Sequence, residues 1–296
     1  MQATLKTIIP VGNILGEGII CDPRLGQVWW TDIHAAKLYA LEHGAEEPTV
    51  YDLPERLGSL GLTDDPHTLI CAFASGFYLY KPASGERTLV VETNANTPGV
   101  RLNDGRLDRE GRFWAGSMVE NAAIANGLKG TLYSLERGVL KTHMGGIRIS
   151  NGLAWNKAGT RMYFADTPTG AIKQMNYDPA TGCYDNETIF AAVDAPAGAD
   201  GATVDSEDHY WSAHWGTGQV VRYRPDGSIA CVLEVPDAAH VACVEFGGPD
   251  MNHLYVSTAR WEMDGDMLAS NPLAGHLFVY ETDVKGVAQK KFYGLN

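Results

Sequence analysis

Five polar side chains stand at matching positions along the chain, each five residues before a turn. They are Glu17, Ser59, Asn103, Asn151 and Asp200, in the contexts LGEG, LGSLG, LNDG, SNGL and ADGA. Carboxylates and amides offer oxygen ligands, which suit hard cations such as Ca²⁺, Mg²⁺ or Mn²⁺. Because a buried carboxylate without a partner is costly, two of them grouped with amides predict a divalent cation between them. Three protein ligands would leave positions for water and substrate, as catalysis requires.

A purely structural interpretation stays open for each of these residues. Asn-Gly and Asp-Gly are common turn signals, so any one of them is more often a backbone feature than a ligand. Glu17 lies between two glycines and fits a solvated loop equally well. What favours a metal site is the position that the residues share relative to the turns.

The turns belong to a repeat that extends along the chain. They start at Asp22, Asp64, Asp108, Asn156, Asp205 and about Asp250. The intervals of roughly 40–50 residues, filled with short strands and turns, are typical of propeller blades. Residues 149–166, ISNGLAWNKAGTRMYFAD, show the hairpin most clearly. We therefore expect an all-β, six-bladed β-propeller, with the divalent metal held in a central channel that the first strand of each blade lines.

This propeller is expected to occupy residues 1–296 as a single domain, although length alone would suggest about two. The ring must close, so residues 4–9 are predicted to pair with the sheet of the last blade. Two inserts, at 119–129 and 261–272, interrupt the third and sixth blades. We expect them to lie over the metal end of the channel and to select the substrate.

Composition excludes some partners. The net charge of −13 argues against nucleic acid, which needs a basic surface. No apolar run is long enough for a signal peptide or a membrane span, so no membrane partner is expected. The five cysteines are an odd number without C-x-x-C spacing, which favours reduced thiols and a cytoplasmic protein. We expect a monomer or a weak homo-oligomer.

Several long motifs resemble the gluconolactonases and regucalcin (senescence marker protein), a family of six-bladed propellers. The resemblance covers nearly the whole chain. It rests on LGEG at 15–18, RLNDGRLDREGRFWAGSM at 101–118, ISNGLAWNKAGTRMYFADT at 149–167 and DGATVDSEDHYWSAHWG at 200–216. One departure is Ala199, which stands where the family usually has proline before the DG of the fifth blade.

The resemblance assigns roles to individual residues. It implies that Glu17, Asn151 and Asp200 hold a divalent metal, with Ca²⁺ favoured and Zn²⁺, Mn²⁺ or Mg²⁺ as alternatives. It implies that Arg101, Asn103 and Glu120 bind the substrate, a small sugar lactone. The expected reaction is hydrolysis of the lactone to the sugar acid. The metal would polarise the lactone carbonyl, and either Asp200 or a hydroxide on the metal would activate the attacking water.

Two other functions stay open. One is a broader metal-dependent esterase or phosphotriesterase, since one metal can polarise either electrophile. The other is a non-catalytic calcium-binding propeller. Loop residues near the same end are further candidates for substrate contact, each with a structural role as the alternative: His34, Arg148, His214 and Trp215. Core or structural roles are expected for Trp29, Trp30, Trp114, Cys243 and Glu245.

Overall fold

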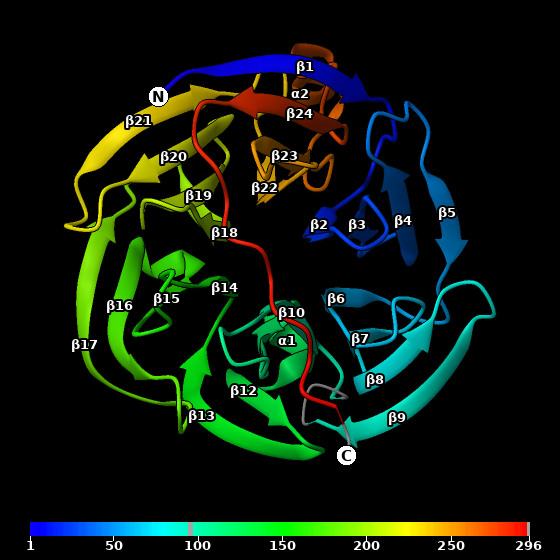
Figure 1. Ribbon diagram of the computed structural model, residues 1–296, viewed down its shortest axis with the longest axis vertical. Helices are drawn as coiled ribbons and strands as arrows, with labels where there is room; N and C mark the ends of the chain where they lie inside the picture. The colour runs from blue at the N-terminus through cyan, green and yellow to red at the C-terminus, as the bar shows by residue number, and fades with distance from the viewer. Residues whose placement is uncertain (94–96, 295–296) are drawn as a thin grey trace.

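The computed structural model describes residues 1–93 and 97–294. Within these residues, six four-stranded antiparallel sheets surround a central axis, which confirms the six-bladed β-propeller (Figure 1). The innermost strands are β2 (Gly16–Asp22), β6 (Leu57–Leu62), β10 (Val100–Leu107), β14 (Ser150–Trp155), β18 (Gly198–Val204) and β22 (Val241–Gly247). The second strands are β3 (Gln27–Asp32), β7 (Leu69–Phe73), β11 (Phe113–Val119), β15 (Arg161–Asp166), β19 (Tyr210–Trp215) and β23 (His253–Thr258).

The outer half of each blade follows the same order. The third strands are β4 (Lys37–Glu42), β8 (Gly76–Lys81), β12 (Gly130–Glu136), β16 (Ala171–Asp178), β20 (Gln219–Tyr223) and β24 (Leu277–Thr282). The outermost strands are β5 (Thr49–Asp52), β9 (Glu86–Glu92), β13 (Val139–Ile147), β17 (Cys183–Ala192), β21 (Ile229–Glu234) and β1 (Ala3–Ile9). The two predicted inserts hold the short helices α1 (Ala122–Ala125) and α2 (Gly265–Ser270), and a 3-10 turn η1 (Thr167–Thr169) follows β15.

Both ends of the chain contribute to the sixth blade. Strand β1 pairs antiparallel with β24, with Thr4 opposite Glu281 and Ile8 opposite Phe278. This pairing confirms the predicted closure of the ring. It covers the outer edge of β24, which would otherwise expose unpaired backbone groups.

Aromatic side chains fill the spaces between the blades. Trp30, Trp114, Trp155 and Trp211 are fully buried, which confirms the core assignment of Trp30 and Trp114, and Trp29 is also buried. Since each blade packs chiefly on its two neighbours, this packing fixes how the innermost strands are spaced around the channel.

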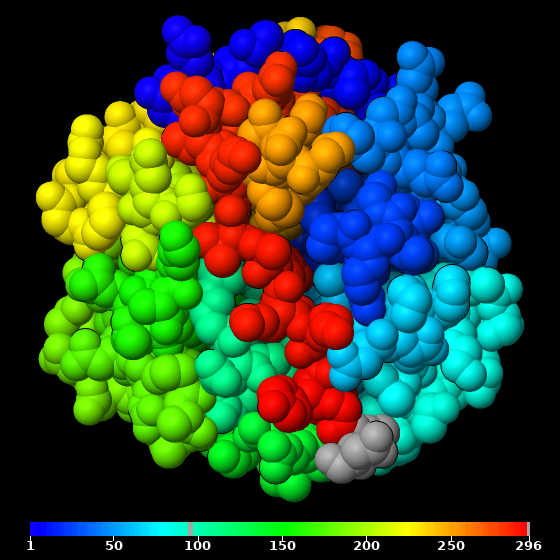
Figure 2. All heavy atoms as spheres, viewed as in Figure 1, coloured from blue at the N-terminus to red at the C-terminus, as the bar shows by residue number. Residues whose placement is uncertain are grey.

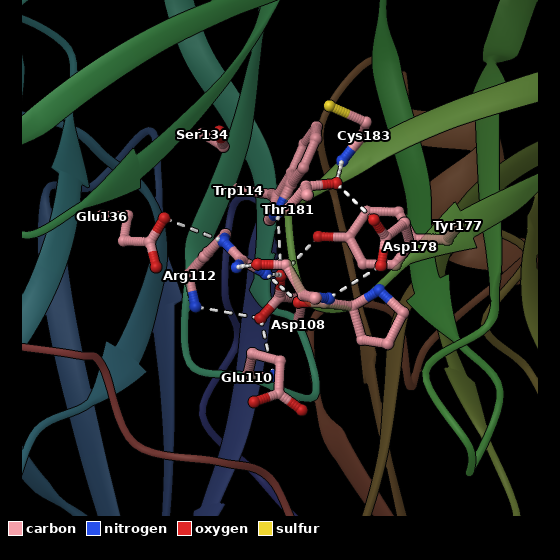
Figure 3. A network of polar contacts seen from close by, with 12 residues as sticks. Asp108, Glu110, Arg112, Trp114, Ser134, Glu136, Tyr177, Asp178, Thr181 and Cys183 are labelled. Atoms are coloured by element: carbon pink, nitrogen blue, oxygen red, sulfur yellow. Dashed lines mark hydrogen bonds and ion pairs between the residues drawn. The ribbon is translucent and has the colours of Figure 1, made fainter.

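The hairpin turn of the third blade is held by Asp108, its first residue. Asp108 accepts hydrogen bonds from the backbone nitrogens of Glu110 at 2.8 Å and Arg112 at 2.9 Å, and its carboxylate also meets the Tyr177 hydroxyl (Figure 3). Arg112 donates onward to the carbonyl of Pro179 at 2.7 Å, which ties the third blade to the fourth. Asp108 thus has a structural role, and it follows β10 at the end away from Arg101 and Asn103.

Four of the innermost strands, β2, β10, β14 and β18, contain a β-bulge at a similar level. The register shifts fall between Glu17 and Ile20, between Leu102 and Gly105, between Asn151 and Ala154, and between Ala199 and Ala202. Gly18 and Gly152 follow Glu17 and Asn151 with φ of +61° and +68°, a conformation that favours glycine. Bulges redirect side chains next to functional sites. Here the bulges explain why glycine follows Glu17 and Asn151. Asn151-Gly152 is part of strand β14 and does not form a turn.

A C-terminal strap, residues 285–294, crosses one face of the ring over the channel (Figures 1 and 2). Its backbone is anchored on three blades: Ser206 donates to the Lys285 carbonyl at 2.7 Å, Phe292 donates to Leu62 at 2.7 Å, and Tyr293 donates to Gly111 at 2.9 Å. The Phe292 side chain is buried. The strap therefore closes one end of the channel and leaves the other end for ligands.

Helices are few and short in the described part of the chain, and none there has the length and apolar character that crossing a membrane requires.

Candidate active site

A cavity of about 160 Å³ opens at the end of the channel opposite the strap. Its lining combines polar residues of the innermost strands with apolar residues from the loops: Leu15, Glu17, Arg101, Asn103, Met118, Ile149, Asn151, Thr167, Asp200, Trp215, Trp261 and Glu262. The structure thus brings together Glu17, Asn151, Asp200, Arg101 and Asn103, five of the six residues that the sequence assigns to the site. Glu120 lies just behind this lining.

A polar ring around the channel is formed by Glu17, Arg101, Asn103, Asn151 and Asp200. The pKa values of its two acidic residues are strongly raised. Burial raises the pKa of Glu17 well above its usual value, and repulsion from Asp200 and Asp104 raises it further. Burial likewise raises the pKa of Asp200, with added repulsion from Asp104. Perturbed carboxylates in a cavity are typical of functional sites. A cation between them would oppose both shifts, because it stabilises the charged form of each carboxylate.

The donor set fits a divalent ion. Glu17, Asn151 and Asp200 come from three blades and are all buried, at 5%, 3% and 6% exposure. They supply only oxygen ligands, and the negative charge of the two carboxylates balances a divalent charge. These three residues would hold the ion, as the sequence predicts.

Hydrogen bonds connect the amides of the ring. Arg101 Nη1 donates to Asn103 Oδ1 at 2.6 Å, and Asn103 Nδ2 donates to Asn151 Oδ1 at 3.0 Å and to the Ser150 carbonyl at 3.0 Å. Asn151 Nδ2 then donates to Thr167 Oγ1 at 2.9 Å. Asn103 therefore positions Arg101 and Asn151 directly, and both of its amide hydrogens are engaged.

Arg101 is a buried cation at the base of the cavity. Its Nε donates to Glu120 Oε1 at 3.1 Å, and its Nη1 also donates to the Leu102 carbonyl at 3.1 Å. Among the described residues, Nη2 has no hydrogen-bond acceptor, so its two hydrogens are available to a ligand. Burial lowers the pKa of Arg101, although the guanidinium stays charged because its ordinary pKa is so high.

Glu120 binds two arginines. Besides Arg101, both of its oxygens contact Arg56 Nη1, at 2.6 and 2.7 Å, and these hydrogen bonds help to keep the pKa of Glu120 below its usual value even though burial opposes them. The ion pair joins the insert at 119–129 to the segment before β6. Glu120 thus orients Arg101, and its predicted contact with a substrate hydroxyl stays a prediction.

Aromatic side chains form the rim. The rings of His34 and Trp261 stack with 3.9 Å between centroids, and those of Trp215 and His240 stack at 4.2 Å. His240 Nδ1 lies 2.9 Å from the Trp261 carbonyl, which can only accept, so the imidazole donates there. These contacts fix Trp215 and Trp261 as two apolar walls above the polar ring.

Other residues singled out in the sequence lie elsewhere. Ser59 is buried beside Gly105, where a Cβ would lie 2.5 Å from Ser59 Oγ, and it is not part of the cavity wall. Arg148 is exposed, and its backbone nitrogen donates to the Asp166 carboxylate. His214 points away from the cavity to the Tyr223 hydroxyl at 3.2 Å. Glu245 is buried at the strap end against Arg106, a structural position as expected.

Some residues of the site were not singled out by the sequence, among them Thr167, Trp261, Glu262 and Arg56. Thr167 closes the motif at 149–167, Trp261 and Glu262 begin the predicted insert at 261–272, and Arg56 precedes the second blade. Thr167, Trp261 and Glu262 lie at the boundary of a motif or an insert, and such a boundary can be recognised in the sequence. For Arg56 the sequence holds none, because its role depends on a contact with a residue 64 positions away.

Comparisons with known proteins identify the family of the chain. Residues 15–260 match the model of the SMP-30/Gluconolactonase/LRE-like region family. An L-arabinolactonase from Azospirillum brasilense is 35% identical over 299 residues, covering 99% of this chain and 96% of that protein. A 6-deoxy-6-sulfogluconolactonase from Pseudomonas putida is 31% identical, covering 99% of this chain and all of the relative.

A solved structure is also similar along its length. The calcium-binding protein regucalcin from Agrobacterium tumefaciens superposes with a TM-score of 0.91 and 31% identity, covering 98% of this chain and 97% of that one. Together, the family match and these full-length similarities confirm the resemblance seen in the motifs: the protein belongs to the SMP-30/gluconolactonase/LRE-like family.

Proposed function

We propose that this protein hydrolyses a sugar lactone to the corresponding sugar acid in a metal-dependent reaction. The observation that carries the proposal is the convergence of two buried carboxylates, an amide oxygen and a free guanidinium edge in one cavity. The full-length similarity to proteins named as lactonases supports the same chemistry. Residues 1–296 would serve as one domain.

Glu17, Asn151 and Asp200 would hold one divalent ion, for which Ca²⁺ is our first choice. When bound, such an ion supplies Lewis-acid polarisation of the lactone carbonyl and stabilises the negative charge that develops on it. The Agrobacterium relative is described as a calcium-binding protein, which agrees with this choice of ion.

The chain's own residues would then orient the lactone and move a proton. Arg101 donates through Nη2 to an oxygen of the sugar, and Asn103 Oδ1 retains capacity to accept from a hydroxyl. The faces of Trp215 and Trp261 pack against the C–H face of the ring and exclude water from it. Asp200 accepts the proton of the attacking water and returns it to the leaving ring oxygen.

The test is lactone opening, followed by proton release, with chelator-stripped protein to which Ca²⁺, Mg²⁺, Mn²⁺ or Zn²⁺ is returned. The panel holds neutral and acidic pentono- and hexonolactones, an aryl ester and a phosphotriester. We expect metal-dependent turnover of sugar lactones. Asp200→Asn should lower kcat at least about 100-fold, whereas Asp194→Asn, an exposed matched control, should leave it unchanged.

Other outcomes would favour the alternatives. Turnover of the aryl ester or phosphotriester alone would replace the lactonase assignment with a broader esterase. Metal binding without turnover of any substrate would favour a non-catalytic calcium-binding propeller.

A further inference from the structure

Thr167 connects the two blades that carry Asn151 and Asp200. It is the first residue of η1, directly after β15, and its backbone nitrogen donates to the Ile149 carbonyl at 3.1 Å. Its hydroxyl accepts from Asn151 Nδ2 at 2.9 Å and donates to the Ala199 carbonyl at 2.7 Å. A Cβ on Gly198 would lie 2.9 Å from Thr167 Cγ2, so the side chain is wedged against β18.

The direction of these hydrogen bonds is fixed at both ends. A backbone carbonyl can only accept, so the Thr167 hydroxyl must give its single hydrogen to Ala199 and must accept from Asn151. At the other end, a guanidinium can only donate, so Asn103 Oδ1 faces Arg101 and Asn103 Nδ2 faces Asn151 Oδ1. The two ends therefore impose one orientation on the Asn151 amide.

Asn151 has a single side-chain oxygen with which to bind a cation. If its amide rotated by half a turn, Nδ2 would meet Asn103 Nδ2, and two donors would face each other. The oxygen would then point at Thr167, away from the cation. The hydroxyl of Thr167 is what makes the observed orientation fully hydrogen-bonded, because it supplies the acceptor that Nδ2 needs.

We propose that Thr167 is a positioning residue: its hydroxyl orients the Asn151 amide so that the oxygen is presented to the cation, and it thereby sets the affinity of the site. This inference rests on the proposed metal site and adds a residue that does not itself touch the ion. Groups that orient metal ligands typically change metal affinity by about 10–100-fold when removed.

The experiment measures binding of Ca²⁺ and of Mn²⁺ by isothermal titration calorimetry to the full, chelator-stripped chain. Thr167→Val keeps the shape and removes the hydroxyl, and we expect its Kd to rise about 10–100-fold. Thr167→Ser keeps the hydroxyl and should stay within about twofold of the unmodified protein. Thr169→Val is the matched control, because Thr169 lies in the same turn and, among the described residues, its hydroxyl bonds only to the Asp166 carbonyl.

A second pair of variants separates orientation from a merely structural role. In Asn151→Asp the two carboxylate oxygens are equivalent, so no orientation has to be imposed. Adding Thr167→Val to Asn151→Asp should then change the Kd by less than about threefold, whereas a packing defect would lower affinity equally in both backgrounds. If circular dichroism shows the valine variant to be unfolded, Thr167→Ala replaces it, since alanine relieves the contact with Gly198.

The failures are distinguishable. If the unmodified protein binds metal and Thr167→Val binds within twofold of it, the role of Thr167 is wrong and the metal site stands. If the unmodified protein binds neither ion, both the proposed function and this inference are overturned.

Discussion

The two ends of the channel both bury charged groups, but they neutralise them differently. At the strap end, Glu245 contacts Arg106 and Gln289 of the strap. Its carboxylate also accepts hydrogen bonds from Thr203 Oγ1 at 2.9 Å and from the backbone nitrogen of Phe246 at 2.8 Å. At the cavity end, Glu17 and Asp200 face each other and Asp104, and the pKa of each is raised. The carboxylate at the strap end is neutralised by the chain itself, whereas the carboxylates at the cavity end would gain stability from an added cation.

This difference shows how to tell a structural buried charge from a functional one in this fold. Burial alone does not separate Glu245 from Glu17, because both are almost fully buried. What separates them is whether the chain supplies the countercharge. Buried ion pairs are costly to break, and uncompensated carboxylates are kept where a ligand compensates them.

The largest expected effect comes from breaking the ion pair at the strap end. Arg106→Met leaves Glu245 buried without its cation, so the free energy of unfolding should fall by about 3–5 kcal/mol. Urea unfolding of the chelator-stripped protein measures it. The double variant Arg106→Met with Glu245→Met should recover most of the loss. A single variant that lost less than about 1 kcal/mol would show that the two ends do not differ in this way.

A smaller expected change in the free energy of unfolding tests whether water reaches His214, which lies behind the cavity. Burial lowers the pKa of His214 to about 4, against about 6.5 in an unfolded chain. Protonation therefore favours unfolding: the contribution of His214 is fully present above pH 6.5 and is lost as the pH falls toward 4. The free energy of unfolding should drop by at most about 3 kcal/mol over this range through His214.

The measurement compares the pH dependence of urea unfolding in the unmodified protein and in His214→Gln, whose amide can still accept from Tyr223. The difference between the two curves isolates His214 from the other titrating groups. Parallel curves would mean that water reaches His214.

The smallest expected change in the free energy of unfolding concerns Glu17 at the cavity end of the channel. Glu17→Gln removes one of the mutually repelling carboxylates, so the chelator-stripped variant should be about 1 kcal/mol more stable than the unmodified protein at pH 8. It should also lose the stabilisation that Ca²⁺ confers. Glu46→Gln, at an exposed acidic residue between β4 and β5 that lies outside the cavity lining, is the control and should change neither quantity. A less stable Glu17→Gln variant would show that Glu17 is held by favourable contacts.

The repeat of turns was enough to predict the ring, since each blade is a local unit with its own hairpin signals. The polar residues Glu17, Asn151 and Asp200 were predictable for the same reason, because they share a position relative to those turns. The β-bulges were not, because Gly152 after Asn151 reads equally well as a turn. The contacts of Glu120 with Arg56 and of Thr167 with Ala199 depend on how blades and loops meet in space, and no local pattern encodes that.

The pairing of β1 with β24 also bears on how the protein is made. Strand β1 leaves the ribosome before the other described strands but pairs with β24, so it must wait for its partner while the intervening blades fold. A chain released before β24 is complete would carry an open edge at each end of its row of blades. Open edges pair readily with other chains, so unfinished molecules would be prone to association, whereas in the finished molecule the facing edges of β1 and β24 pair with each other.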